Sequence, residues 1–201
     1  MKKVVYFLVI FAIFASLAGC AGQKDTITFH SEWSSLTNQK RASYEVNIGN
    51  KVGGATVTAE LWQDGECTKG TPLTINSGTK TIDISLLIDE LWTENAEKAL
   101  NVQIGTNEQS GSVLTAFPLP EGVIGYSFAA YNDREKIEVN PGEEVILCAL
   151  AFDTGSGVRS VDCKSLIDEP GKLKEYSCIA VIRMVFTAAQ IAPQAEASEK
   201  P

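Results

Sequence analysis

Residues 144–152 read EVILCALAF, and residues 176–186 read YSCIAVIRMVF. Both runs are almost continuously apolar and rich in β-branched and aromatic side chains, without the alternation that marks a strand with one face in water. Strands buried on both faces have this character. The two runs therefore predict strands that neighbour or face each other at the centre of a sheet. The second run is shorter than the roughly 20 residues of a membrane-spanning helix, and it carries Arg183.

Turn-forming residues divide the rest of the chain into shorter runs of strand character. The turn signals are Gly49-Asn50, Gly53-Gly54, Asp64-Gly65, Pro141-Gly142, Gly155-Ser156-Gly157 and Pro170-Gly171. The strands predicted between them cover residues 26–33, 42–48, 55–62, 79–87, 101–104, 112–117 and 123–131. Residues 85–100 differ, because apolar side chains recur four apart and predict a helix of one or two turns. Many short strands with at most one short helix predict an all-β fold, an antiparallel β-sandwich.

The composition predicts one folded domain. The domain is assigned to residues 27–187, which form either a single β-sandwich domain or two tightly packed halves that meet near residues 108–122. Residues 188–201 contain no aromatic side chain and are rich in Ala, Glu and Pro, which predicts a disordered tail. The formal net charge of −8 argues against nucleic acid as a partner, because an acidic protein repels phosphate.

The start of the chain reads MKKVVYFLVIFAIFASLAGC, with two lysines, a short apolar stretch and small residues before Cys20. This segment resembles the signal peptide of prokaryotic lipoproteins, and Leu17-Ala18-Gly19-Cys20 resembles their lipobox. The resemblance implies removal of residues 1–19 and attachment of two or three acyl chains to Cys20, enough for stable anchoring. Residues 20–26 are then the lipid anchor and a short tether. The protein would sit in the cell envelope, on the outer side of the cytoplasmic membrane or in the outer membrane. An ordinary secreted or membrane-spanning form is the alternative.

Assigning Cys20 to lipid leaves Cys67, Cys148, Cys163 and Cys178. An even number of cysteines in an exported protein predicts two disulfides, with three possible connectivities. We favour Cys148–Cys178 with Cys67–Cys163, since the first two lie in the central apolar runs. The other two connectivities and four free thiols remain open.

Two stretches resemble immunoglobulin folds. Tyr176 stands two residues before Cys178, as the tyrosine corner does, and residues 46–66 (VNIGNKVGGATVTAELWQDGE) are similar to immunoglobulin-like adhesion modules of prokaryotic cell surfaces. The resemblance implies an immunoglobulin-like sandwich for the domain.

Few residues suggest catalysis. Asp153-Thr154-Gly155 resembles the signature of aspartic proteases, but that chemistry needs two aspartates and the chain has no second such motif. A dimeric aspartic protease is thus a remote alternative to an ordinary turn. His30 is the only histidine, and there is no C-x-x-C pair or glycine-rich phosphate loop. We therefore predict no catalytic, cofactor-binding or metal-binding residue, and no enzyme.

Two features of the sequence are candidates for ligand binding. Trp33, Trp62 and Trp92, with Tyr44, Tyr126 and Tyr131, are candidates for an aromatic platform that stacks on sugar rings. The acidic segments 133–138 and 162–169 lack the ligand spacing of a strong calcium site. The sequence predicts a lipid-anchored envelope protein that acts non-enzymatically on a protein partner, for example by strand addition at a sheet edge. A small-ligand or glycan binder is the alternative.

Overall fold

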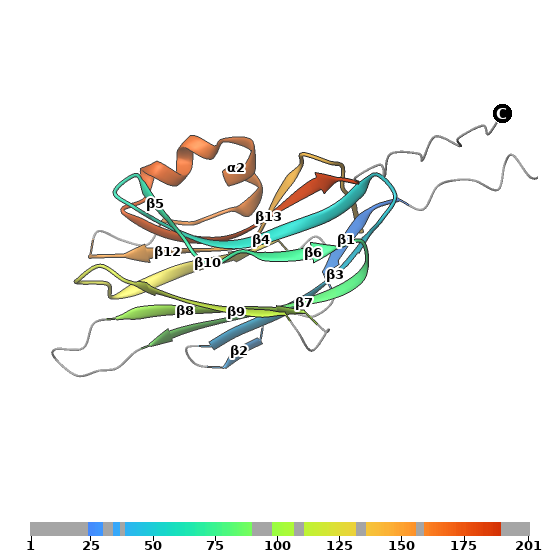
Figure 1. The fold of residues 1–201 in the computed structure, drawn as a ribbon. Coiled ribbons are helices and arrows are strands. Elements are labelled where there is room, and N and C mark those ends of the chain that lie inside the picture. The colour runs from blue at the N-terminus through green and yellow to red at the C-terminus, as the bar shows by residue number, and fades with distance from the viewer. Residues whose placement is uncertain are drawn as a thin grey trace, which may run out of the picture.

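Two antiparallel β-sheets pack face to face in the computed structural model, which describes residues 24–29, 34–36, 39–89, 98–106, 111–131, 136–155 and 159–189 (Figure 1). Sheet 1 has the order β11 (Ile137–Glu138), β1 (Thr26–Phe29), β3 (Gln39–Ile48), β7 (Gly78–Asp89), β8 (Ala99–Thr106) and β9 (Ser112–Pro118), with β2 (Ser34–Leu36) paired to β3. Sheet 2 has the order β10 (Gly125–Ala130), β12 (Glu144–Asp153), β13 (Cys178–Ala188), β4 (Val52–Gln63) and β5 (Glu66–Lys69), with β6 (Leu73–Asn76) paired to β4. The predicted all-β sandwich is confirmed.

The two apolar runs form β12 and β13, which pair with each other in the interior of sheet 2. Their inner faces pack into the core between the sheets, where Leu150 and Ile182 are almost completely buried. Their outer faces lie under α2 (Cys163–Asp168) and η1 (Pro170–Glu175), which bury Leu166 and Leu173 against Val181 and its neighbours (Figure 1). Cover on both faces explains why these two strands lack alternation.

The helix expected over residues 85–100 is wrong wherever the structure describes this segment. Residues 85–89 belong to β7 and residues 99–100 to β8, while residues 90–97 lie outside the described part. Ile82, Ile84 and Leu86 alternate into the core, and this period of two outweighs the recurrence four apart. The α-helix lies instead at Cys163–Asp168, in a segment read as an acidic loop, where the Asp162 carboxylate accepts from the Ser165 N–H at 2.8 Å.

Gly53 and Gly54 lie inside β4 rather than in a turn. A Cβ atom on Gly53 would stand 2.4 Å from the Cα of Ala189, and one on Gly54 would stand 2.9 Å from the carbonyl oxygen of Ile75. The two glycines therefore permit close approach of neighbouring backbone. The predicted turn at Asp64-Gly65 is present, and both residues have positive φ.

Asp25 fastens the start of the described chain to the turn before β4. Its buried carboxylate accepts four backbone N–H groups, from Gly49, Asn50, Lys51 and Val52, at 2.7–2.9 Å. Burial raises the pKa of this carboxyl, but the four donors together outweigh it and leave the pKa below its usual value. The sequence assigned Asp25 and Thr26 to the tether, whereas their exposed fractions are 5% and 3%.

The two ends of the described chain lie together. The N–H of Ala189, just after β13, donates to the carbonyl of Lys51 at 2.9 Å, in the same turn that Asp25 holds. The start of β1 and the end of β13 thus leave the sandwich at one end, which we call the terminal end (Figure 1). Within the described residues, no helix has the length and apolarity needed to span a membrane.

Candidate functional site

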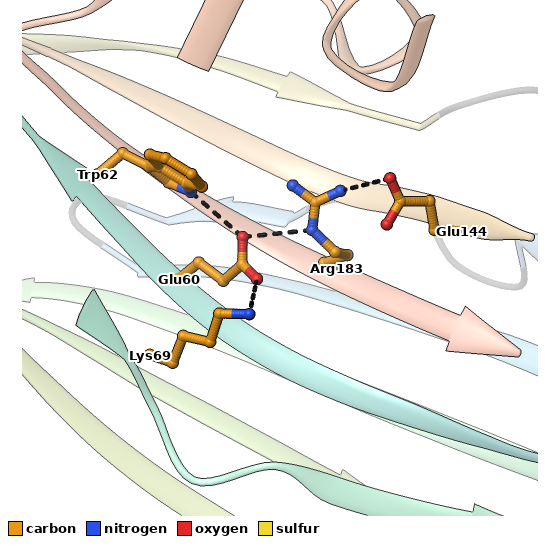
Figure 2. Close-up of polar contacts among 5 residues, drawn as sticks. All are labelled: Glu60, Trp62, Lys69, Glu144 and Arg183. Carbon is orange, nitrogen blue, oxygen red and sulfur yellow. Dashed lines mark hydrogen bonds and ion pairs between the residues drawn. The ribbon is translucent and has the colours of Figure 1, made fainter. Parts of the chain in front are cut away.

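Four charged side chains and a tryptophan gather on the outer face of sheet 2, beside the area that α2 covers (Figure 2). Glu60 and Trp62 come from β4, Lys69 from β5, Glu144 from β12 and Arg183 from β13. We call these five residues the Glu60 cluster. It combines segments from the two halves of the chain.

Strand register brings the cluster together. Lys69 pairs directly with Glu60 across β4 and β5. Arg183 pairs with Thr58 and lies two residues from Val181, the partner of Glu60, so its side chain is a diagonal neighbour on the same face. Alternation along β4 sends Ala59 and Leu61 into the core and leaves Glu60 on the outer face.

The Glu60 carboxylate is nearly inaccessible, with 4% of its side chain exposed. Its Oε2 accepts from Trp62 Nε1 and from Arg183 Nε, both at 3.2 Å, and its Oε1 lies 3.4 Å from Lys69 Nζ. Arg183, with 11% of its side chain exposed, also places Nη1 3.0 Å from Glu144 Oε1. Figure 2 shows Glu60 held from three sides and Arg183 bridging the two acids.

A surface depression of about 310 Å³ opens over these groups, and Thr58 and Val185 complete its lining. The cluster offers hydrogen-bond donors, a carboxylate and one indole, and its formal charges sum to zero. These groups suit binding. The arrangement does not resemble the nucleophile and base pairs of covalent catalysis.

The favoured pair Cys148–Cys178 is wrong in this structure. Both residues lie on paired strands, but Cys148 is opposite Ile182, four residues along β13 from Cys178. That offset corresponds to about 13 Å, whereas a disulfide needs Cα atoms within about 7 Å.

The pair Cys67–Cys163 is also wrong. Cys67 lies on β5 at one edge of sheet 2, and Cys163 Sγ contacts the carbonyl of Ala129 on β10 at the other edge. The four intervening strand spacings amount to about 19 Å. All four cysteines are free thiols, and burial raises the pKa of Cys163 and of Cys178 to about 12.

Asp153, at the end of β12, caps its own turn. Its carboxylate accepts from the Gly155 N–H at 2.9 Å, and Gly155 has a φ of +112°. This hydrogen bond is that of an Asx turn, which is the ordinary turn that the sequence Asp-Thr-Gly forms. Tyr176 donates from its hydroxyl to the Ser160 carbonyl at 3.2 Å, in the loop before α2.

The aromatic platform is not assembled in the described part of the chain. Trp62 belongs to the Glu60 cluster, but Tyr44 is buried in the core, and Tyr126 and Tyr131 pack against it. Trp33, Trp92 and His30 lie outside the described residues, as do Cys20 and residues 133–135. Among the residues with described positions, no group of three or more His, Cys, Asp and Glu is placed to hold a metal ion.

Sequence reasoning did not select Glu60 or Arg183 as site residues, although each left a signal. Each is the single charged residue of its strand, ATVTAELW and YSCIAVIRMVF, and the two charges are opposite. Such charges rarely become buried without a partner, so the two strands were candidates for neighbours. Comparisons of the chain with protein-family models, with curated proteins and with solved structures found no match.

Proposed function

We propose that the mature chain is a lipid-anchored protein of the cell envelope that acts non-enzymatically through protein contacts, in a structural, adhesive or assembly role. Acyl chains on Cys20 would hold it to the membrane. The observation that carries the proposal is the position of Asp25, which fixes the start of the domain at the terminal end of the sandwich.

This attachment point would orient the domain. Asp25 lies five positions after Cys20, a distance of at most about 17 Å along the chain, so the terminal end would stay close to the bilayer. The twelve residues of β4 extend about 40 Å towards the other end of the sandwich. The Asp64-Gly65 turn, the loop with Ile124 and the turn at Thr154-Gly155 would then face away from the membrane. Ile124 is 75% exposed there.

The edge of sheet 1 favours a protein partner. β9 pairs with β8, and none of the described strands pairs with its other side. Leu114 on β9 is 70% exposed, and Leu87, on the same outer face, is 38% exposed. An unpaired strand edge beside exposed apolar side chains is a site for strand addition.

Site-specific cross-linking in native membranes tests the proposal. A photoreactive amino acid at position 114 should yield one stoichiometric adduct with an envelope protein, and the same amino acid at position 164, on the exposed side of α2, should not. The N-terminal peptide should carry the mass of acyl chains on Cys20, and Cys20→Ser should release the protein from membranes. Recovery of a lone monomer with an unmodified N-terminus would contradict the proposal.

A small-ligand or glycan binder is the second candidate, and the Glu60 cluster is the observation that favours it. The dimeric aspartic protease has less in its favour, because the Asp153 carboxylate already serves its own turn.

A further inference from the structure

We propose that the Glu60 cluster is a binding site for a neutral, polyhydroxylated ligand, a single saccharide unit at the end or side of a glycan. The proposal does not rest on the membrane anchor or on a protein partner, and it concerns a different face from the edge strand β9.

Fold stability alone gives little reason for the buried charges. Farther along the same outer face, Val181, Ile179 and Ala149 pack against α2 and η1 without any charge. A buried ion pair is commonly no more stabilising than apolar side chains of similar volume, because its desolvation offsets the attraction. The buried pair of Glu60 and Arg183 therefore indicates a function other than stabilising the fold.

The cluster keeps hydrogen-bonding capacity after its internal contacts are made. A guanidinium has five N–H donors, and Arg183 uses one at Nε and one at Nη1. An ammonium has three, and Lys69 uses one on Glu60. Glu144 uses Oε1, and its side chain is 36% exposed. No other described residue takes up the remaining groups of Arg183, Lys69 and Glu144, and all three line the depression.

Charge selects the class of ligand. Two acids and two bases lie together, so an anion would meet the carboxylates of Glu60 and Glu144, and a cation would meet Arg183 and Lys69. A neutral hydroxyl avoids both like-charge repulsions, because it accepts from an N–H and donates to the free oxygen of Glu144.

Trp62 and the size of the depression narrow the ligand further. The half-buried indole has its Nε1 fixed by Glu60, which holds the ring beside the polar groups. Aromatic rings beside polar groups suit a sugar, whose ring has apolar C–H faces and a polar rim. The volume of about 310 Å³ is at the low end for small-molecule sites, which suits one unit.

The test uses the full chain in detergent, with isotope-labelled tryptophan and calorimetry. The probes are the neutral tetramers cellotetraose, maltotetraose and N-acetylchitotetraose, with tetragalacturonate and the chitosan tetramer as charged counterparts. We expect at least one neutral tetramer to bind and to shift the indole N–H signal of Trp62, which Trp62→Phe identifies. The charged tetramers should bind more weakly.

Variants on exposed residues keep the test independent of folding. Lys69→Ala and Glu144→Gln should each weaken that binding about tenfold, which corresponds to about 1.4 kcal/mol, while Lys172→Ala on η1 should leave it unchanged. The proposal is overturned if no neutral tetramer moves the Trp62 signal. It is equally overturned if a charged tetramer binds as well as the neutral one, or if Lys69→Ala and Glu144→Gln bind like the parent chain.

Discussion

The hydroxyl of Tyr44, on β3 of sheet 1, donates a 2.8 Å hydrogen bond to the carbonyl oxygen of Leu147, on β12 of sheet 2. The register of β12 shifts between Ile146 and Cys148, so Leu147 lies in a bulge. Its carbonyl also accepts from the Tyr131 N–H at 2.9 Å. One carbonyl at the bulge thus accepts both a main-chain N–H of its own sheet and a hydroxyl from the opposite sheet.

Replacing Tyr44 by Phe should lower the free energy of unfolding by about 1–2 kcal/mol, the cost of a lost buried hydrogen bond. Urea unfolding measures the change. Tyr176→Phe is the matched control, because its hydroxyl bonds the Ser160 carbonyl at an exposed site, and it should cost less than about 0.5 kcal/mol. Equal losses of unfolding free energy in the two variants would show that the hydrogen bond between the sheets stabilises the fold no more than an exposed one does.

Asp25→Asn should destabilise the domain by about 3 kcal/mol, because an amide accepts fewer of the four N–H donors and a charged acceptor is lost. The lowered pKa of Asp25 sets the sign of the pH dependence. Its contribution is present above the unfolded pKa of about 3.9 and is lost as the pH falls through the lower folded pKa.

Urea unfolding of the parent chain and of Asp25→Asn, repeated from neutral pH down into the acid range, checks this assignment. The parent should lose more stability on acidification than the variant does. Glu138→Gln, which breaks an exposed ion pair with Lys24, should change stability by less than about 1 kcal/mol at any pH. The same acid sensitivity in parent and Asp25→Asn would rule out Asp25 as the titrating group.

Gly53→Ala should destabilise the chain by about 2 kcal/mol, because its Cβ would meet backbone atoms of Ala188 and Ala189 that cannot move without shifting the end of β13. Gly125→Ala is the control, since nothing lies within 4 Å of its Cβ. Thermal unfolding compares the two. Similar melting temperatures would place the end of β13 farther from β4 than described.

The sequence predicted the sandwich because its strongest signals were local. Residues 144–152 and 176–186 were apolar on both faces, and each face proved to have cover. The sequence did not predict the cysteine positions or the Glu60 cluster, because both depend on the register between strands. Nothing local places Cys148 opposite Ile182 rather than Cys178, and nothing local places Lys69 opposite Glu60. Asp25 was assigned to the tether for the same reason, because its four hydrogen-bond donors lie in a turn more than twenty residues away.

Four free thiols should be found when the chain is denatured in an alkylating reagent without reductant, and mass spectrometry counts the adducts on Cys67, Cys148, Cys163 and Cys178. In the native state Cys67 should react first, because it is half-buried whereas the other three thiols are buried. Burial raises the pKa of all four thiols, so exposure decides the order of reaction. A disulfide-linked peptide pair among these cysteines would contradict the strand register described above.

The last prediction separates the two reasons for keeping a buried ion pair. Arg183→Met alone should cost about 3–5 kcal/mol, because it leaves the carboxylate of Glu60 buried with one exposed cation. The double variant Glu60→Leu, Arg183→Met should recover most of that loss, since apolar neighbours can pack in the same place. Urea unfolding of the parent, of Arg183→Met, of Glu60→Leu and of the double variant completes the cycle.

If the double variant is as unstable as the single ones, the fold requires the ion pair, and the pair is not kept for binding. If the double variant is stable and no longer binds the neutral tetramer, the pair is retained for its ligand.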